Sequence, residues 1–265
     1  MAIITISRGV YAGVETLAEL LVEGLGYRLY TREQLLVDAA KHYGASQSQV
    51  ESAVENKPGF LEGRGMRKLH YIYCVQATMA RAAQADDLVY HGQAGHLLLG
   101  PMPHHLRVRA AANMQFRIAM VMEQCNLSRQ KAVDYLKQAD AARNRWIKWV
   151  HGVEADDIRT YDLVVNLERV SFATAAAIIA ETSRREFQTT PESQQMLDDL
   201  VIGSEVRARI GLDRDIADDK IGIDASKAVI TISANVRSLA DVQKAKELAS
   251  QVPGVKQVET EIGTA

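Results

Sequence analysis

The chain has 265 residues, of which 47% are hydrophobic and 24% charged, so it can bury one large core or two smaller ones. Its formal net charge of -2 argues against a general nucleic-acid binder, which would carry a basic face. The two cysteines, Cys74 and Cys125, form no CxxC pair, so neither a disulfide framework nor a zinc site is indicated. We expect a bacterial-type cytoplasmic protein with reduced thiols.

The N-terminal segment lacks the pattern of a signal peptide, because Arg8, Glu15 and Glu19 interrupt its apolar residues. No apolar run approaches the roughly 18 residues needed to cross a bilayer. From Met196 onward, nine lysines and arginines stand against twelve aspartates and glutamates, which does not favour binding to an anionic membrane. We therefore expect neither nucleic-acid nor membrane binding.

The first 186 residues predict strands that alternate with helices. Residues 3–6 form a β-branched run typical of a buried strand, and a glycine-bearing loop leads from it into a helix over 15–23. Further strands are predicted over 27–30, 88–91, 106–110 and 163–166, and further helices over 32–42, 46–57, 67–85, 114–124, 128–149 and 171–186. The strands are apolar without polar alternation, which indicates an α/β fold with a five-stranded parallel sheet covered by helices.

The remaining residues have a different pattern. Residues 187–195 are polar, contain Pro191 and lack apolar periodicity, which is typical of a linker. Beyond them we expect a small α+β module of αββαβ order, with helices over 196–210 and 238–251 and strands over 221–224, 229–234 and 255–262. We predict a first domain over 1–186, a linker over 187–195 and a second domain over 196–265, with limited contact between the domains.

The loop after the first strand has the architecture of a phosphate site, in which backbone N–H groups and a helix N-terminus point at an anion. The full motif needs two glycines five apart, followed by lysine and serine or threonine. Here Gly9 and Gly13 are four apart, Val14 stands at the lysine position and Glu15 follows it. Spacing alone favours a plain strand–helix turn.

Several segments, in their order and spacing, nevertheless resemble the cytidylate-kinase-like family of P-loop kinases over residues 1 to about 186. The matching segments are ITISR at 4–8, LAELL at 17–21, GY at 26–27, YTRE at 30–33, VYHGQAGH at 89–96, DAAR at 140–143 and YDLVVN at 161–166. The resemblance implies a P-loop kinase fold that uses ATP and Mg²⁺ on a nucleoside monophosphate.

The same resemblance implies roles for particular residues. The phosphate and cofactor positions are Arg8, Gly9, Tyr11, Ala12, Gly13, Val14 and Thr16. Arg117 and Arg143 fall where the family clamps phosphates during catalysis. Gly92, Gln93 and Asp140 fall at substrate-binding positions, and no protein metal ligand is implied.

Departures from the family pattern concentrate at the phosphate loop. Of the family's GSGG element, aligned with residues 11–14, only Gly13 remains. Tyr11 places a ring where the backbone must approach a phosphate, and Glu15 adds a negative charge. Gln93 and Thr31 replace an arginine and an aspartate of the family. Because phosphoryl transfer depends on positioning and charge neutralisation, these losses predict a weak or absent activity.

Two functions follow from this pattern. We favour a degenerate kinase-like protein that senses a nucleotide or another small anionic ligand, or that serves assembly. The alternative is an active CMP- or dCMP-type nucleoside monophosphate kinase with ATP and Mg²⁺ as cofactors.

The C-terminal module resembles a BON domain. The matching features are SEVRARI at 204–210, VITIS at 229–233, the helix from Ser238 and VPGVKQV at 252–258. BON domains are associated with phospholipid or other ligands and with protein contacts. Because the chain shows no targeting signal, we expect a protein partner or self-association through this module.

Other conspicuous residues have simpler explanations. Residues 104–105 are adjacent histidines with no nearby carboxylate or cysteine, so we expect no metal site there. His91 and His96 flank a loop and are more typical of structural histidines than of ligand contacts. Trp146 and Trp149 lie three apart on a basic helix, where packing is favoured over stacking on a base.

Overall fold

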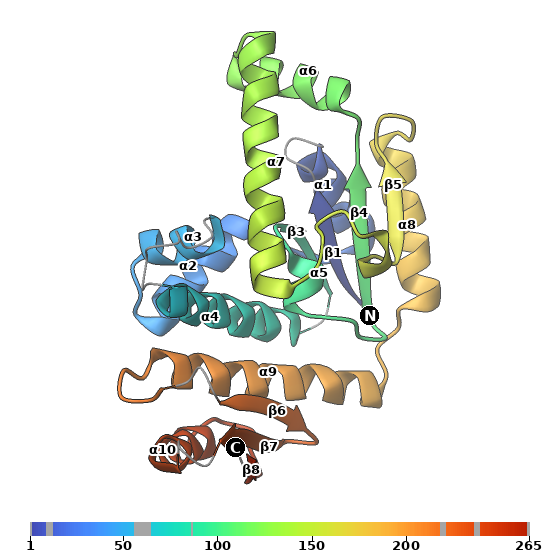
Figure 1. The fold of residues 1–265 in the computed structure, drawn as a ribbon. Helices are drawn as coiled ribbons and strands as arrows, with labels where there is room; N and C mark the ends of the chain where they lie inside the picture. The colour runs from blue at the N-terminus through green and yellow to red at the C-terminus, as the bar shows by residue number, and fades with distance from the viewer. Residues whose placement is uncertain are drawn as a thin grey trace. The chain divides into compact units, whose positions relative to one another are not determined.

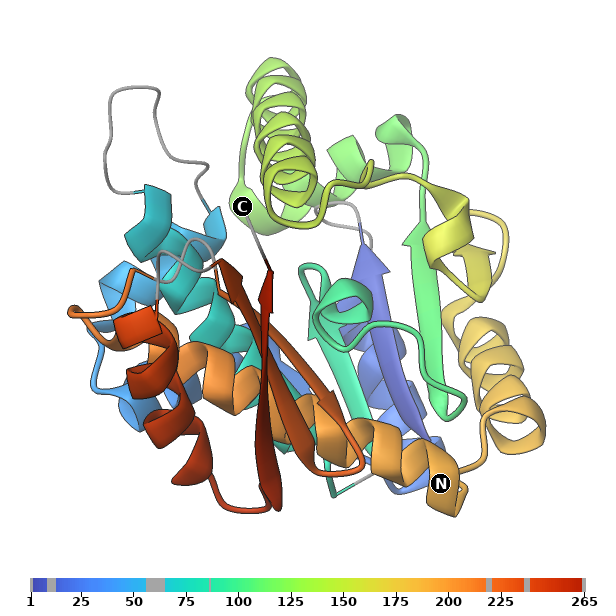
Figure 2. The same ribbon diagram turned by 60° about the horizontal axis from the view of Figure 1, so that its bottom comes forward.

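The computed structural model describes residues 2–8, 13–55, 65–85, 87–217, 221–235 and 239–263, and for residues 8, 65–67 and 235 it describes the backbone alone. The chain divides into two compact units. The first unit comprises residues 1–35, 55–57 and 85–190, and the second comprises residues 36–54, 58–84 and 191–265. Figures 1 and 2 show the elements of both units.

Five parallel strands form the sheet of the first unit, in the order β2-β3-β1-β4-β5. The strands are β1 Ile3–Arg8, β2 Arg28–Thr31, β3 Leu88–Gly92, β4 His105–Ala111 and β5 Leu163–Asn166. The predicted five-stranded parallel sheet is therefore confirmed. Its order puts β1 at the centre, between β3 and β4 (Figure 1).

One face of this sheet carries the main core. Ile4 and Ile6 of β1 are fully buried there, because alternate residues of a strand share a face. α1 (Val14–Leu25) and α8 (Phe172–Glu186) cover this face and pack against each other. The buried residues of α1 recur at helical spacing, at Val14, Leu17, Ala18 and Leu21.

Thr5 and Ser7 alternate with those isoleucines and therefore face the opposite side of the sheet. The short helix α5 (Gly95–Leu98) packs on that side. A Cβ added at Gly95 would lie 2.4 Å from Cδ1 of Tyr90 and 3.3 Å from Cβ of Thr5. Gly95 is thus required for the close approach of α5 to β1 and β3.

Two further helices, α6 (Met114–Cys125) and α7 (Arg129–His151), follow β4, and a 3-10 helix, Ile158–Thr160, precedes β5. α7 is 23 residues long and buries only a narrow set of side chains, including Trp146 and Ile147. Across the described part of the chain, no helix is both long and apolar enough to cross a membrane.

The second unit holds a three-stranded sheet of β6 (Gly222–Ser226), β7 (Val229–Asn235) and β8 (Gln257–Gly263). β6 pairs antiparallel with β7, and β8 pairs parallel with it. α9 (Pro191–Leu212) and α10 (Leu239–Ser250) contribute to a core that includes Val206, Ile210, Ile230, Ile232, Val242 and Ala245. The predicted small α+β module is confirmed.

The helices α2 (Arg32–Tyr43), α3 (Gln47–Glu55) and α4 (Gly65–Ala83) lie between β2 and β3 in the chain, yet most of their residues belong to the second unit. The expected limited contact between residues 1–186 and 196–265 is wrong for this segment. α4 and α9 lie side by side (Figure 1), with Ala208 packed among Cys74 and Ala77. The guanidinium of Arg207 lies 4.4 Å from the ring centroid of Tyr73.

The predicted linker also differs from the structure in its second half. α9 begins at Pro191, five residues before the predicted helix start, so residues 187–190 alone separate it from α8. Proline suits the first position of a helix, because its fixed φ is helical and its missing N–H has no partner there. The proline that suggested a linker therefore starts a helix.

Candidate functional site

The carboxyl ends of β1, β3 and β4 meet at one edge of the first unit's sheet, where ligands bind in open parallel sheets. In register, Ser7 lies beside Gly92 on one side and beside Arg109 on the other. α1 covers one face of the sheet, and residues 93–96 follow β3. Residues from three separate segments of the sequence are thus brought to one edge.

Gly13 is the residue before α1 and has φ +72, a left-handed conformation that favours glycine. A Cβ at this position would also lie 2.6 Å from Cζ of Phe172. Glycine is therefore required here by the backbone and by the packing of α8. The presence of glycine at position 13 is therefore explained without a phosphate.

Val14, which stands at the lysine position of the motif, is fully buried in the main core. Its side chain packs with the sheet and so contributes nothing to the loop. Glu15 and Thr16, the next two residues of α1, are exposed. The charge presented at the start of α1 is accordingly the carboxylate of Glu15.

Two arginines from different elements meet beyond this edge. Arg109 of β4 donates from Nη2 to Oδ1 of Asp156 at 2.6 Å, and Nη2 of Arg143, on α7, lies 3.9 Å from the same oxygen. The side chains of Arg109 and Arg143 are 14% and 9% exposed, whereas that of Asp156 is 70% exposed. Two largely buried cations therefore share one exposed carboxylate.

These guanidinium groups are incompletely paired. Within the described residues, Nη1 of Arg109 and Nε of Arg143 are buried and have no hydrogen-bond partner. Burial and the neighbouring charge of Arg109 lower the pKa of Arg143 from its usual value. Both observations indicate that the positive charges of Arg109 and Arg143 are only partly compensated by negative groups.

Two aromatic side chains, Tyr161 and His96, lie beside these arginines. Tyr161 donates from its hydroxyl to the carbonyl of Ala155 at 3.1 Å and lies 3.4 Å from Oγ of Ser7. The guanidinium of Arg109 lies 5.8 Å from the Tyr161 ring centroid, and the ring of His96 lies 4.4 Å from it. Burial and nearby positive charges lower the pKa of His96 to about 3, so His96 is neutral.

Arg117 and Asp140, predicted as a catalytic clamp and a substrate contact, bind each other in this structure. Arg117 Nη1 and Nη2 donate to the two Asp140 carboxylate oxygens at 2.9 and 2.8 Å. Arg117 is 8% exposed. This bidentate pair ties α6 to α7 and leaves Arg117 committed to a protein partner.

The structure brings some of the predicted site residues to one edge of the sheet, and it places other residues there that were not predicted. Gly13, Gly92 and Arg143 lie at or beyond the carboxyl edge, while Gly9, Tyr11, Ala12 and the Arg8 side chain lie outside the described residues. Arg109, Asp156 and Tyr161 were not predicted as site residues. The alternation of Arg107 and Arg109 within an otherwise apolar strand was the available signal.

Metal binding has no local support in the described residues. No group of three or more histidine, cysteine, aspartate or glutamate side chains among them is placed to hold a metal ion. The adjacent histidines at 104–105 are both buried, and His105 bonds to Thr5 and to the carbonyl of Gly100.

Comparison with known proteins gives two matched stretches. Residues 3–169 match the Cytidylate kinase-like family, and residues 198–264 match the BON domain. The cytidylate kinase of Methanothrix thermoacetophila is 23% identical over 168 residues, which cover 63% of this chain and 89% of that protein. The matched stretches coincide with the two resemblances found in the sequence.

The fold of the first unit is similar to that of a solved structure. An uncharacterized protein from Eubacterium ventriosum has a TM-score of 0.53 at 18% identity, covering 70% of this chain and 100% of its own. A shikimate kinase from Acinetobacter baumannii, in complex with shikimate, has a TM-score of 0.39 at 13% identity, covering 68% of this chain and 92% of its own.

Proposed function

Because the chain belongs to the cytidylate kinase-like family and carries a BON domain, we propose that it binds a nucleotide or another small phosphate-bearing anion and transfers phosphoryl groups poorly. The ligand's phosphate binds at the carboxyl edge of the first sheet. Arg109 and Arg143 hold it, and the protein acts by sensing the ligand rather than by turning it over.

The observation that carries this proposal is the incomplete pairing of two buried guanidinium groups. A buried donor without a partner costs about 1–3 kcal/mol, and a hydrogen bond to a charged group contributes about 1.5–3 kcal/mol. A phosphate that accepts from Nη1 of Arg109 and Nε of Arg143 would recover this cost. The carboxylate of Asp156, which accepts from Arg109 and lies 3.9 Å from Arg143, supports the presence of an anion beside the two groups.

The surroundings favour an anion with a polar, hydrogen-bonding body. Neutral His96 adds no charge and has a buried Nδ1 without a hydrogen-bond partner among the described residues. The hydroxyl of Ser7 and the ring of Tyr161 lie beside the arginines. A ribose or base could therefore find both a donor and a stacking surface.

Poor transfer follows from the start of α1. A kinase needs positive charge that follows the transferred phosphoryl group, and losing one such group raises the barrier by about 3 kcal/mol. Val14 is buried in the core and Glu15 is negative, so neither supplies it. Valine at the lysine position removes a positive charge, and Glu15 adds a negative one. Both differences raise the barrier to phosphoryl transfer.

The alternative is an active CMP- or dCMP-type kinase with ATP and Mg²⁺. The 23% identity to a cytidylate kinase favours it. For this function the Arg117–Asp140 pair would have to open, so that Arg117 could reach a phosphate. Both functions use the same edge of the sheet and differ in rate.

Binding is tested by isothermal titration calorimetry of the full chain with CMP, ATP and cytidine. We expect CMP or ATP to bind and cytidine, which lacks phosphate, to bind at least tenfold more weakly. Arg143→Ala should weaken nucleotide binding about tenfold or more, which corresponds to one lost charged hydrogen bond. Arg145→Ala, an exposed arginine on the same helix, is the control. Equal binding of cytidine and CMP would contradict the proposal.

Activity is tested by a coupled assay with ATP, Mg²⁺ and CMP. Enzymes commonly turn over about 10 times per second, and we expect a rate about a hundredfold to a thousandfold lower. A rate near one per second that Arg143→Ala abolishes would establish the kinase alternative.

For the BON domain we propose a role in protein contact or self-association. β8 is the edge of its sheet, and Ile262 on that strand is 42% exposed. An edge strand offers unpaired backbone groups to another chain. Sedimentation velocity should therefore give a concentration-dependent mass that Ile262→Lys reduces. A mass that stays monomeric at every concentration would leave a different protein as the partner.

A further inference from the structure

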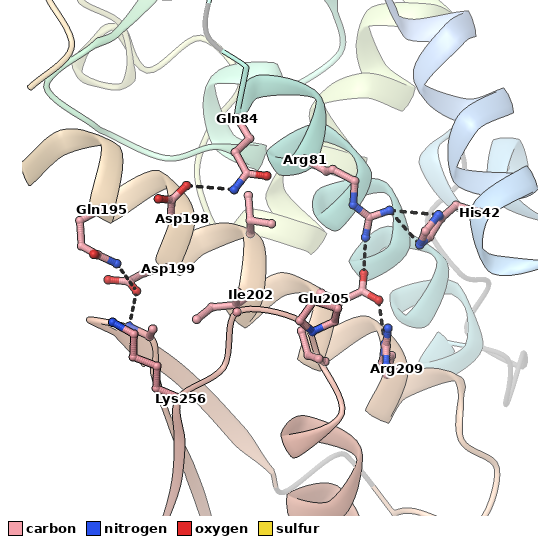
Figure 3. A pocket seen from close by; sticks show the side chains of 15 residues that line it. His42, Arg81, Gln84, Gln195, Asp198, Asp199, Ile202, Glu205, Arg209 and Lys256 are labelled. Carbon is pink, nitrogen blue, oxygen red and sulfur yellow. Dashed lines mark hydrogen bonds and ion pairs between the residues drawn. The ribbon is translucent and has the colours of Figure 1, made fainter. Parts of the chain in front are cut away.

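The second unit contains a cavity that is independent of the candidate nucleotide site. Its volume is about 740 Å³, within the range of small-molecule sites. α2 and α4 line it with His42, Arg81 and Gln84, α9 with residues 195–209, and the turns around β6–β7 and α10–β8 close it (Figure 3). All of these residues belong to the second unit.

The acidic groups of this cavity have partners within the protein. Glu205 accepts from Tyr43, Arg81 and Arg209 at 2.5, 2.7 and 2.7 Å (Figure 3 shows the two arginines). Burial raises the pKa of Glu205, but the bonds from Tyr43 and Arg209 outweigh it, so the pKa lies below its usual value. Glu205 is therefore a carboxylate whose oxygens are already occupied.

Asp199 is similarly occupied. Its carboxylate accepts from the backbone N–H groups of Lys227 and Ala228 at 2.7 and 2.8 Å, and from the Gln195 amide at 3.0 Å. Lys227 and Ala228 both have positive φ, which is costly for residues with a Cβ, so Asp199 stabilises a strained hairpin turn. Asp198, in turn, accepts from Gln84 at 3.0 Å and from Gln194 at 3.1 Å.

The basic groups keep donors available. Among the described contacts, the side chain of Arg209 donates only from Nε, so its two terminal nitrogens are not used. The backbone N–H of Lys256 bonds to Ala228, and its exposed side chain has no described contact. Burial and the charge of Arg81 lower the pKa of His42, which therefore adds no further charge at neutral pH. The charged donors left unused are the terminal nitrogens of Arg209 and Nζ of Lys256, whereas Oδ2 of Asp198 is the one carboxylate oxygen of the cavity without a described hydrogen bond. Unused cationic donors therefore outnumber unused carboxylate oxygens.

Apolar side chains form the rest of the wall. Ile202 and Val252 are buried beside the cavity, and Val201, Ala228 and Pro253 complete the apolar lining. Cationic donors and carbon surface in one cavity complement a molecule with a charged end and an apolar body. We propose that this cavity binds a small amphipathic anion, one that carries a phosphate or carboxylate group on an apolar body.

The probes for this site are 1-naphthyl phosphate, 1-naphthoate and 1-naphthol, titrated into the full chain by calorimetry. They share one apolar body and differ in the head group. At least one anion should bind about tenfold more tightly than 1-naphthol, because a charged hydrogen bond distinguishes them. The tighter anion identifies the head group as phosphate or carboxylate. Equal affinity of 1-naphthol and both anions would overturn the proposal.

Substitutions inside and outside the cavity test whether the anion binds there. Lys256→Ala should weaken anion binding severalfold, whereas Lys246→Ala, an exposed lysine on α10 outside the cavity, should leave it unchanged. Val201→Trp should fill the cavity and abolish binding of the anion. Arg143→Ala should have no effect, since Arg143 belongs to the other site. Identical affinity in Lys256→Ala and Lys246→Ala would overturn the proposal even if Val201→Trp fails to fold.

Discussion

The two arginine clusters of the chain differ in the carboxylate that their guanidinium groups share. Arg109 and Arg143 face Asp156, which is 70% exposed, and each keeps a buried nitrogen without a described partner. Arg81 and Arg209 face Glu205, which is 6% exposed and also accepts from Tyr43. The first cluster leaves buried donors unused, whereas the second is complete around its carboxylate. Removing a charge should therefore affect binding in one cluster and stability in the other.

The largest expected effect is that of Glu205→Ala. The change leaves Arg81 and Arg209 facing each other without a counter-charge and leaves the Tyr43 hydroxyl without its acceptor. Breaking a buried charge network by removing one partner costs about 3 kcal/mol, less where the arginines reach solvent. Urea denaturation followed by circular dichroism should show this loss.

Glu247→Ala, on the exposed face of α10, is the matched control and should change stability by less than about 0.5 kcal/mol. If both variants unfold at the same urea concentration, the Glu205 network does not hold the second unit together.

A second large effect should appear as a pH dependence of the first unit. His105 is buried, its Nδ1–H donates to the carbonyl of Gly100 at 2.7 Å, and Nε2 accepts from the Thr5 hydroxyl at 2.8 Å. Burial lowers the pKa of His105 to about 4, against about 6.5 when unfolded. The unfolded chain therefore takes up the proton first, and stability is lost as the pH falls from about 6.5 to 4.

The full loss from this histidine is about 3 kcal/mol, since each pH unit of pKa difference corresponds to about 1.4 kcal/mol. His105→Asn keeps a donor for the Gly100 carbonyl and removes the titrating group. We expect its stability to fall less steeply between pH 6.5 and 4 than that of the unchanged chain. Parallel pH profiles would show that His105 does not carry this dependence.

The fold was largely predictable because its signals are local. The β-branched run at 3–6 and the apolar residues at 106, 108 and 110 predict buried strands, and both segments lie within strands of the sheet. The sequence did not predict that most of residues 36–84 belong to the second unit. Packing of small residues such as Ala77 against Ala208 joins positions that are far apart in the sequence. The predicted linker over 187–195 was too long, because proline suits both a linker and the first position of a helix.

The carboxyl edge of the sheet was predictable from the sequence, whereas the side chains that meet there were not. A glycine-bearing loop after a first strand fixes the ligand edge in parallel sheets, and the family pattern added Arg143. Arg117 and Asp140 lie 23 residues apart, and nothing in their spacing reveals that they pair with each other. Arg109 looked like one residue of a buried strand, and only the register beside Ser7 brings it to the edge.

A smaller effect should distinguish a binding residue from a structural one. Arg143→Ala removes a buried charge whose desolvation its protein partners only partly offset, so the ligand-free chain should keep its stability or gain about 1 kcal/mol. Thermal unfolding without nucleotide measures this. Arg117→Ala is the comparison and should destabilise, because it leaves Asp140 without its bidentate partner. A loss of stability in Arg143→Ala as large as in Arg117→Ala would make Arg143 structural.

The smallest expected effect comes from Glu15, the one negative charge in the first turn of α1. The helix dipole stabilises an anion near a helix N-terminus by about 0.3–1 kcal/mol. The carboxylate of Glu15 occupies this position and repels the phosphate of a ligand. Glu15→Lys removes the competing charge and adds an attractive one, so we expect nucleotide affinity to rise about threefold to tenfold, more at low salt than at high salt. Glu19→Lys, exposed one turn further along α1, changes the net charge equally and should have a smaller effect. Turnover should stay low in Glu15→Lys, because the neighbouring Val14 is fixed in the core and no other side chain of this first turn is cationic. Equal gains from both variants would mean that net charge, rather than the start of α1, attracts the ligand.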